Sequence, residues 1–194
     1  DADNDSVTIT LDGAITVNVE NDLPTLSLSE SRVSGTVQED ALGNTTAGQD
    51  NNGDDDFSTG NIDDNQTDTD TVVLDLKPLV DSSEGADEPA PVTWGITAID
   101  AAGVDSGYTS AGLKVFYFTE GGTLVARTVD NNVVNMGSTV FTFAVDGNGL
   151  ATFNLNDQLD HSGAENDDEL LAVSNLGSFV EATVTDADND SVTI

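Results

Sequence analysis

The stretch TVFTFAVDGNGLATFNL, residues 139–155, decides the fold class of this chain. Apolar residues recur with a period of about two through TVFTFAV (139–145) and again through LATFNL (150–155), which is the period of a β-strand with one buried face. Between them lies DGNG (146–149), whose residue types favour a tight turn. Residues 139–155 are therefore predicted to form a β-hairpin.

The same alternation recurs on both sides of this hairpin, and no stretch shows a convincing helical period. A second hairpin turn is predicted at EGG (120–122). About a dozen strands with no helix predict an all-β fold, either a β-sandwich or a barrel. The other candidate strands are SVTITL (6–11), AITVNV (14–19), TLSL (25–28), VSGTV (33–37), TVVLDL (71–76), VTWGITAI (92–99), LKVFYF (113–118), TLVARTV (123–129), LLAVS (170–174) and FVEATVT (179–185).

The nonapeptide DADNDSVTI occurs twice, at residues 1–9 and at residues 186–194. Nine identical residues in order indicate one period of a tandem array together with the first residues of the next copy. In residues 7–19 the apolar residues Val, Ile and Leu all fall at odd positions. This phase favours one long strand kinked at Gly13, although a three-residue loop would also preserve it.

Pro24 cannot take part in regular strand pairing and marks a boundary. We expect residues 1–22 to supply the closing strand of the preceding repeat plus a linker. Residues 23–194 then form one repeat, with a truncated last strand and a long acidic loop at 38–70. We also expect residues 6–19 to fill an open sheet edge, either in this chain or in a neighbouring molecule.

The charge balance is extreme, with 37 Asp and Glu residues against four Lys and Arg, and a formal net charge of −33. Nucleic acids and anionic membranes need cationic surfaces, so neither is expected as a partner. No apolar run approaches the roughly 20 residues of a membrane span, and membrane insertion is not expected. The chain has no cysteine, so disulfides and thiolate metal sites are excluded. Clustered carboxylates without bases point to bound cations.

The segment DADND places alternate aspartates in a turn, where their carboxylates can converge on a hard cation such as Ca²⁺. The first candidate ligand set is Asp186, Asp188 and Asp190, echoed at Asp1, Asp3 and Asp5. An EF-hand is excluded because the sixth position is Ser rather than Gly and a strand pattern follows. The alternative is a solvated Asp-rich turn.

Two further places carry candidate calcium ligands. Glu20 and Asp22 lie in the presumed linker and could share a cation with loops of a neighbouring unit, or the linker could be simply polar. Asp160 lies in NDQLDH (156–161), whose His161 is the chain's single histidine and is expected to have a structural role. We expect no enzymatic activity, because no nucleophile, base or cofactor constellation is visible.

Three segments together resemble the large Ig-like repeats of bacterial type I-secreted RTX adhesins: FNLNDQLDH (153–161), ELLAV (169–173) and ATVTDADND (182–190). The resemblance implies an Ig-like β-sandwich, secretion in one step, display at the bacterial cell surface, and calcium-stabilised repeats that extend a distal binding region for adhesion and biofilm formation. It also makes Asp186, Asp188 and Asp190 the best candidate ligands. Asn189 stands where that family usually has Gly.

Other readings remain open. DADND and ENDLP (20–24) are also similar to cadherin linkers, in which calcium likewise stiffens a string of β-sandwiches. The alternative function is a ligand-binding, lectin-like module of the same adhesin. The partners expected for a spacer are the neighbouring repeats of its own chain.

Overall fold

The protein was analysed as a computed structural model, which describes residues 3, 6–9, 16–42, 69–86, 88–129, 137–161 and 170–194. Within these residues, eleven strands form three antiparallel sheets, and the only helical elements are three short 3-10 turns. The predicted all-β fold with β-sandwich packing is therefore confirmed.

The larger layer is a six-stranded antiparallel sheet. Its hairpin at residues 139–155 forms as predicted, with Phe143 opposite Phe153. Gly121 and Gly122 take positive φ values of 58° and 84° in the other predicted turn, a conformation that glycine adopts without steric cost. The strands, in spatial order, are β2 (Thr71–Asp75), β9 (Leu150–Leu155), β8 (Thr139–Val145), β7 (Thr123–Val129), β6 (Leu113–Glu120) and β5 (Val104–Ser110).

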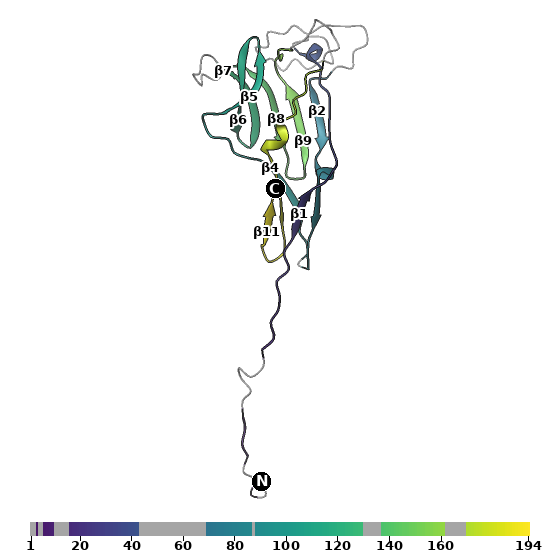
Figure 1. The fold of residues 1–194 in the computed structure, drawn as a ribbon, viewed down its shortest axis with the longest axis vertical. Coiled ribbons are helices and arrows are strands. Elements are labelled where there is room, and N and C mark those ends of the chain that lie inside the picture. Colours follow the sequence, from purple (N-terminus) through teal and green to yellow (C-terminus); the bar gives the residue numbers. More distant parts are fainter. Residues whose placement is uncertain are drawn as a thin grey trace.

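Two smaller sheets make up the remainder (Figure 1). One has the order β11 (Ser191–Thr193), β10 (Val180–Thr185) and β4 (Val92–Ile96). The other pairs β1 (Thr25–Leu28) with β3 (Val80–Ser83). The 3-10 turns are η1 (Glu39–Ala41), η2 (Lys77–Leu79) and η3 (Leu176–Phe179).

The main core lies against the inner face of the six-stranded sheet. Phe141 is fully buried at its centre, with its ring centroid 5.9 Å from that of Tyr117 and 4.8 Å from that of Phe153. A second cluster, around Leu26 and Val184, lies between the two smaller sheets. Trp94 packs against both clusters and so joins the two ends of the molecule, in agreement with its predicted place in the core.

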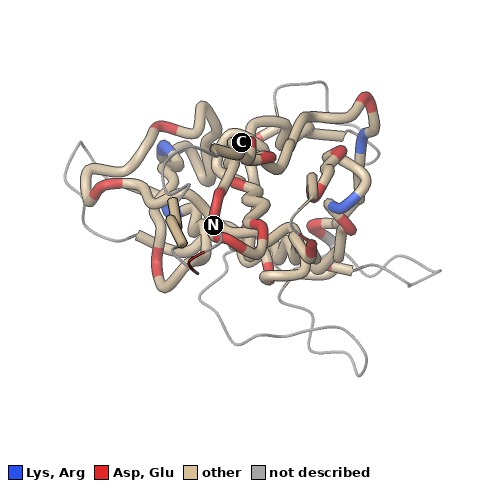
Figure 2. Tube along the Cα trace, turned by 90° about the horizontal axis from the view of Figure 1, so that it is seen from below, with Lys and Arg blue, Asp and Glu red and all other residues tan. Residues whose placement is uncertain are grey.

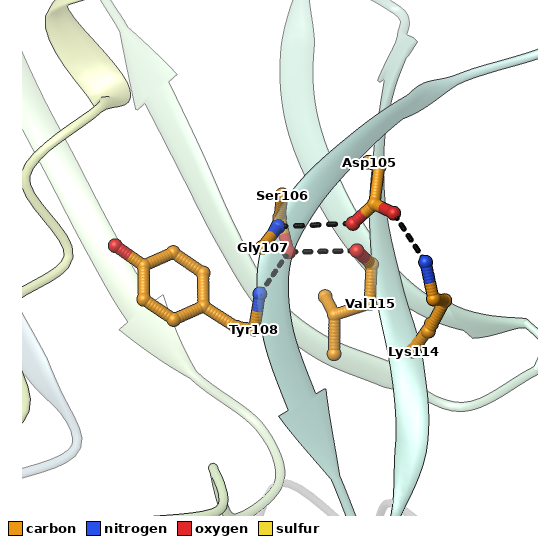
Figure 3. Close-up of polar contacts among 6 residues, drawn as sticks. All are labelled: Asp105, Ser106, Gly107, Tyr108, Lys114 and Val115. Carbon is orange, nitrogen blue, oxygen red and sulfur yellow. Dashed lines mark hydrogen bonds and ion pairs between the residues drawn. The ribbon is translucent and has the colours of Figure 1, made fainter.

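The outer edge strand β5 is interrupted by a bulge between Asp105 and Thr109 (Figure 3), and bulges at sheet edges disfavour pairing with another chain. Gly107 has a φ of 82°, and its N–H donates to Asp105 Oδ1 at 3.0 Å. Ser106 Oγ donates to the Val115 carbonyl at 2.6 Å and accepts the Tyr108 N–H at 3.1 Å. Lys114 Nζ completes the arrangement by contacting Asp105 Oδ2 at 2.7 Å.

Four predicted strands are absent from the described residues, two of them in the N-terminal arm described below, and two observed strands were not predicted. Residues 33–37 and 170–174 lie in no strand, although Val33, Val37, Leu171 and Val173 pack against the core as their alternation suggests. These segments half-bury alternate side chains, and among the described residues no neighbouring strand pairs with them. The unpredicted strands β3 (VDSS) and β5 (VDSGYTS) are polar, so their sequence shows little alternation, and strand neighbours determine their conformation instead.

The N-terminal arm, described at residues 6–9 and 16–22, leads away from the sheets (Figure 1) and belongs to no strand. Its apolar residues Val7, Ile9, Val17 and Val19 are 78–91 % exposed. The expectation that the arm fills a sheet edge within this chain is therefore wrong for the described part. Pairing with a neighbouring molecule stays a prediction, and the expected kink at Gly13 lies outside the described residues.

No helix in the described part of the chain is long and apolar enough to cross a membrane.

Candidate metal centre

The turn between β10 and β11 is closed by its first residue, Asp186. The Asp186 N–H donates to the Asp190 carbonyl at 3.0 Å, and Asp186 Oδ1 accepts the Asp190 N–H at 2.8 Å. Asn189 has a φ of 76°, in the left-handed region. Asparagine tolerates this conformation better than most residues other than glycine.

The turn between β8 and β9 has the same backbone design but carries a single carboxylate, that of Asp146. There Asp146 N–H donates to the Leu150 carbonyl at 2.9 Å, and Asp146 Oδ1 accepts the Leu150 N–H at 2.8 Å. The fourth residue, Gly149, has a φ of 82°. The two turns differ in their carboxylates at the third and fifth positions, where Asn148 and Leu150 stand in one and Asp188 and Asp190 in the other. Turn formation alone therefore does not require the two extra carboxylates.

The three carboxylates of the β10–β11 turn converge. One oxygen from each of Asp186, Asp188 and Asp190 lies within 4.8 Å of the others. Asp186 is only 5 % exposed, whereas Asp190 is half-buried and Asp188 is exposed. Asp186 Oδ2 is buried and accepts no hydrogen bond. A buried carboxylate oxygen without a donor is costly unless a cation supplies the missing interaction.

In the described part of the chain, no ion pair joins a Lys, Arg or His to Asp186, Asp188 or Asp190. Lys77, Lys114 and Arg127 form ion pairs with Asp75, Asp105 and Glu120, at 3.9, 2.7 and 2.9 Å. Figure 2, which views the molecule from the end where the N-terminal arm leaves, shows acidic residues on many loops and basic residues at few places. The three converging carboxylates thus face one another with no described cation among them.

The pKa of Asp188 is raised above its ordinary value, first by its side-chain hydrogen bond with Asp186. This hydrogen bond favours a proton shared between the two carboxyl groups. The negative charges of Asp186 and Asp190 add to the effect. By contrast, the hydrogen bond from the Leu150 N–H lowers the pKa of Asp146 in the counterpart turn. The cluster therefore favours a positive charge, whereas the single carboxylate of the other turn is already satisfied.

The linker reaches this cluster through Asn21. Its side-chain Nδ2 donates to Asp190 Oδ2 at 2.6 Å, across 169 positions of sequence. Asp22 lies against the adjacent turn, because a Cβ at Gly85 would stand 2.9 Å from Asp22 Oδ2. The structure thus brings two predicted constellations, ENDLP and DADND, together at one end of the sandwich. Neither Glu20 nor Asp22 belongs to the group of converging carboxylates.

Asp160 lies elsewhere, at the turn between β5 and β6. Its Oδ2 accepts the Gly112 N–H at 2.9 Å, and its N–H donates to the Thr109 carbonyl at 2.8 Å. These bonds fasten the turn, in which Ala111 and Gly112 have positive φ values of 49° and 78°. The structure therefore assigns Asp160 contacts with the backbone rather than with the other candidate ligands.

His161 has an acidic neighbour that the sequence analysis did not single out. Its Nε2 lies 3.5 Å from Glu39 Oε1, and the same oxygen accepts the Leu159 N–H at 2.6 Å. Glu39 begins the predicted acidic loop, so this contact fastens the start of the loop to the LDH segment. The central part of that loop, residues 43–68, lies outside the described residues.

The N-terminal copy of the aspartate motif is described only in part. Asp3 is exposed, and Asp1 and Asp5 lie outside the described residues. Asn21 is the contributor that sequence reasoning missed, because only carboxylates were considered as ligands. Asn21 lies inside the ENDLP segment (20–24), and this position could have indicated from sequence that Asn21 belongs to the site.

The raised pKa of Asp188 predicts a pH-dependent effect of Asp188→Asn in excess chelator. The folded state binds this proton more tightly than the unfolded state, so protonation of Asp188 stabilises the fold. This stabilisation is full below the ordinary pKa of 3.8 and is lost as pH rises through the raised value. We therefore expect the stability advantage of Asp188→Asn over the parent chain to shrink between neutral pH and about pH 4. Urea denaturation across this range measures it, and a difference independent of pH would contradict the prediction.

Comparison with known proteins places the chain in a family. Neither the curated proteins nor the solved structures gave a match to it. A family described as "Domain of unknown function (DUF5801)" matches residues 36–194, which span the strands from β2 to β11. The chain therefore belongs to the DUF5801 family of domains, whose function is not known.

Proposed function

We propose that this domain is a calcium-stabilised spacer repeat of a large bacterial cell-surface adhesin, with a structural rather than a catalytic role. The observation that carries the proposal is the converging group of Asp186, Asp188 and Asp190, in which a buried oxygen of Asp186 has no donor. Oxygen-only ligands in an irregular turn suit Ca²⁺, which accepts six to eight oxygens in flexible geometry.

Bound calcium would supply the positive charge that the described bases do not bring to this turn. Asp186 would be the buried anchor, held in place by its hydrogen bond to the Asp190 N–H. Asp188 and Asp190 would complete the carboxylate face, and water and backbone carbonyls would fill the remaining positions. The chain's own contribution is to hold the three oxygens within 4.8 Å of one another before the ion arrives.

The place of the site in the fold supports a role at the junction between repeats. Asn21 connects the linker to Asp190, so a rigid β10–β11 turn also fixes the direction in which the preceding segment leaves the sandwich. Glu20 and Asp22 flank that contact and could add oxygens at the same joint. A row of such joints would convert a flexible string of sandwiches into a rod, which suits a spacer that projects a binding region away from a cell.

Two features of the sequence support this setting. The exact recurrence of DADNDSVTI at residues 1–9 and 186–194 suits a tandem array, in which one unit is used many times. The resemblance to repeats of type I-secreted RTX adhesins supports secretion and surface display. Carboxylate clusters whose charge opposes folding in calcium-poor cytosol would permit export of an unfolded chain, followed by folding outside.

The test is thermal unfolding in millimolar calcium and in excess chelator. At a tenfold excess of calcium over the dissociation constant, each site adds about 1.4 kcal/mol to the stability of the folded state. For a domain of this size that corresponds to a rise in Tm of about 3–6 °C. Magnesium is the control, because it needs near-octahedral geometry and dehydrates reluctantly. An equal rise in magnesium, or none in calcium, would contradict the proposal.

A further inference from the structure

The edge of the three-stranded sheet holds one of the two copies of SVTI. Residues 191–194 are docked on β10, and residues 6–9, with the identical sequence, are exposed in the N-terminal arm. The arm therefore shows which sequence follows SVTI in a chain of consecutive copies, namely TLDGAITVNV at residues 10–19. The docked copy shows where that sequence would start.

We propose that a segment with the sequence of residues 10–19, supplied by a second copy of this chain, continues β11 and completes the layer that faces the six-stranded sheet. The inference rests on the tandem arrangement in the proposed function and not on its calcium. It identifies the occupant of this sheet edge as a segment equivalent to residues 10–19, which would close this repeat just as residues 1–22 are expected to close the preceding one.

The register of β11 shows where the occupant would first pair with β10. Ile194 and Ala182 exchange two backbone hydrogen bonds, each of 3.0 Å, so this pair continues the β10–β11 ladder. The next two residues of a continued strand would stand opposite Glu181 and Val180, and Val180 is where β10 begins. In the proposed occupant these two residues are Thr10 and Leu11. Asp12 and Gly13 would follow beyond Val180, the first residue of β10, which is where a kink is needed.

The alternation of side chains along the strand shows which residues of the occupant would face the core. Val192 points inward and packs against the cluster of Leu26 and Val184. Alternate residues of a strand share a face, so Ile194 lies on the same side, as Val7 and Ile9 do in the other copy. In the continuing sequence Leu11, Ile15, Val17 and Val19 keep this phase. The occupant would therefore direct each of them toward the core and none toward solvent.

Apolar surface is available on that face. Leu28 shares a face of β1 with the buried Leu26 but is 77 % exposed, and Ile194 is 40 % exposed. β1 lies close to both β10 and β11. A strand that continues past Ile194 would run along this part of β1 and cover both side chains.

Residues 33–37 alternate like a strand but pair with no described strand. Val33 and Val37 pack against the core, and a Cβ at Gly35 would press on Val72 of β2, so this segment lies over the face of the six-stranded sheet. The Asn21–Asp190 contact aligns the segment leading to β1 with β11. From that contact, the occupant and the segment after Asn21 would advance at the same rate as extended chains, about 3.3 Å per residue. Residues 14–19 of the occupant would then lie beside roughly residues 30–35. The unpaired segment would thus gain a parallel neighbour.

The experiment extends the full chain after Ile194 with the sequence of residues 10–22. The matched control carries the same extension without the residue equivalent to Thr10, which turns its apolar side chains to the opposite face. We measure Tm in excess chelator and follow amide hydrogen exchange. The in-phase extension is expected to raise Tm by at least about 4 °C relative to the control and to slow exchange in residues 31–37 and at Val180.

Equal Tm values for the two extensions would overturn the inference, and so would a rise in Tm without slower exchange in residues 31–37. Because both chains are measured in chelator, neither result depends on a metal. If the two extensions had equal Tm values, the calcium-dependent rise in Tm of the parent chain could still occur. If calcium did not raise the Tm of the parent chain, the two extensions could still differ in chelator.

Discussion

Phe141→Ala is expected to destabilise the domain by about 3–5 kcal/mol, the usual range for removing a fully buried aromatic ring from a core. Phe141 has no exposed surface, and its ring contacts those of Tyr117 and Phe153. These residues come from three strands of the six-stranded sheet, so the cavity would loosen the layer that supports the rest of the fold. Urea denaturation with excess chelator measures the loss without a contribution from bound metal.

The control is Phe116→Ala, on the opposite face of β6. Phe116 is half-buried, stands opposite Arg127 in the ladder, and alternates with the buried Val115 and Tyr117. Truncating it removes the same atoms from a site that is already partly hydrated, so a clearly smaller loss is expected. Equal losses for the two variants would show that the core is not centred where the structure places it.

Asp186→Asn is expected to abolish the calcium-dependent stabilisation, which amounts to about 2.7 kcal/mol at a hundredfold excess of calcium over the dissociation constant. The asparagine Oδ1 can still accept the Asp190 N–H, so the turn keeps its closing hydrogen bond while it loses the buried charge. In chelator the variant should be as stable as the parent chain or more stable, because repulsion among the three carboxylates is relieved. Thermal unfolding with and without calcium separates the two effects.

Asp146→Asn is the matched control for this experiment. Asp146 closes the β8–β9 turn with the same hydrogen bonds, but no other carboxylate of that turn stands beside it. Its substitution should change stability equally in calcium and in chelator, leaving the calcium shift intact. If Asp186→Asn kept the full calcium shift, the ion would have to bind elsewhere in the chain.

Asp186→Asn would bear on the proposed joint between repeats as well as on the β10–β11 turn. Asp190 holds the linker through Asn21, so metal that fixes Asp190 also fixes residues that lie almost a full period away in sequence. Calcium would thus act on stability and on the direction of the neighbouring unit together. The proposed continuation of β11 past Ile194 would strengthen the same joint by strand pairing.

The sequence by itself determined the all-β class, most of the strand positions and the aspartate turn. Segments such as TVFTFAV, LATFNL and TLVARTV combine alternation with clear turn residues at both ends, so local preferences and burial agree. Asp186, Asp188 and Asp190 could also be grouped from sequence, because a five-residue turn brings its own side chains together. These features depend on residues that are close in the chain.

Only the tertiary structure decided the features that depend on residues far apart. VSGTV (33–37) alternates but lacks a neighbouring strand, whereas the polar β3 becomes a strand because β1 pairs with it. The hydrogen bonds by which Asp160 fastens the β5–β6 turn join it to residues about 50 positions away in the chain. Asn21 meets Asp190 only because the packed sheets bring the start and the end of the unit to the same end of the sandwich. Strand pairing and contacts across 169 positions arise from the way the chain folds back on itself, and no local period in the sequence records them.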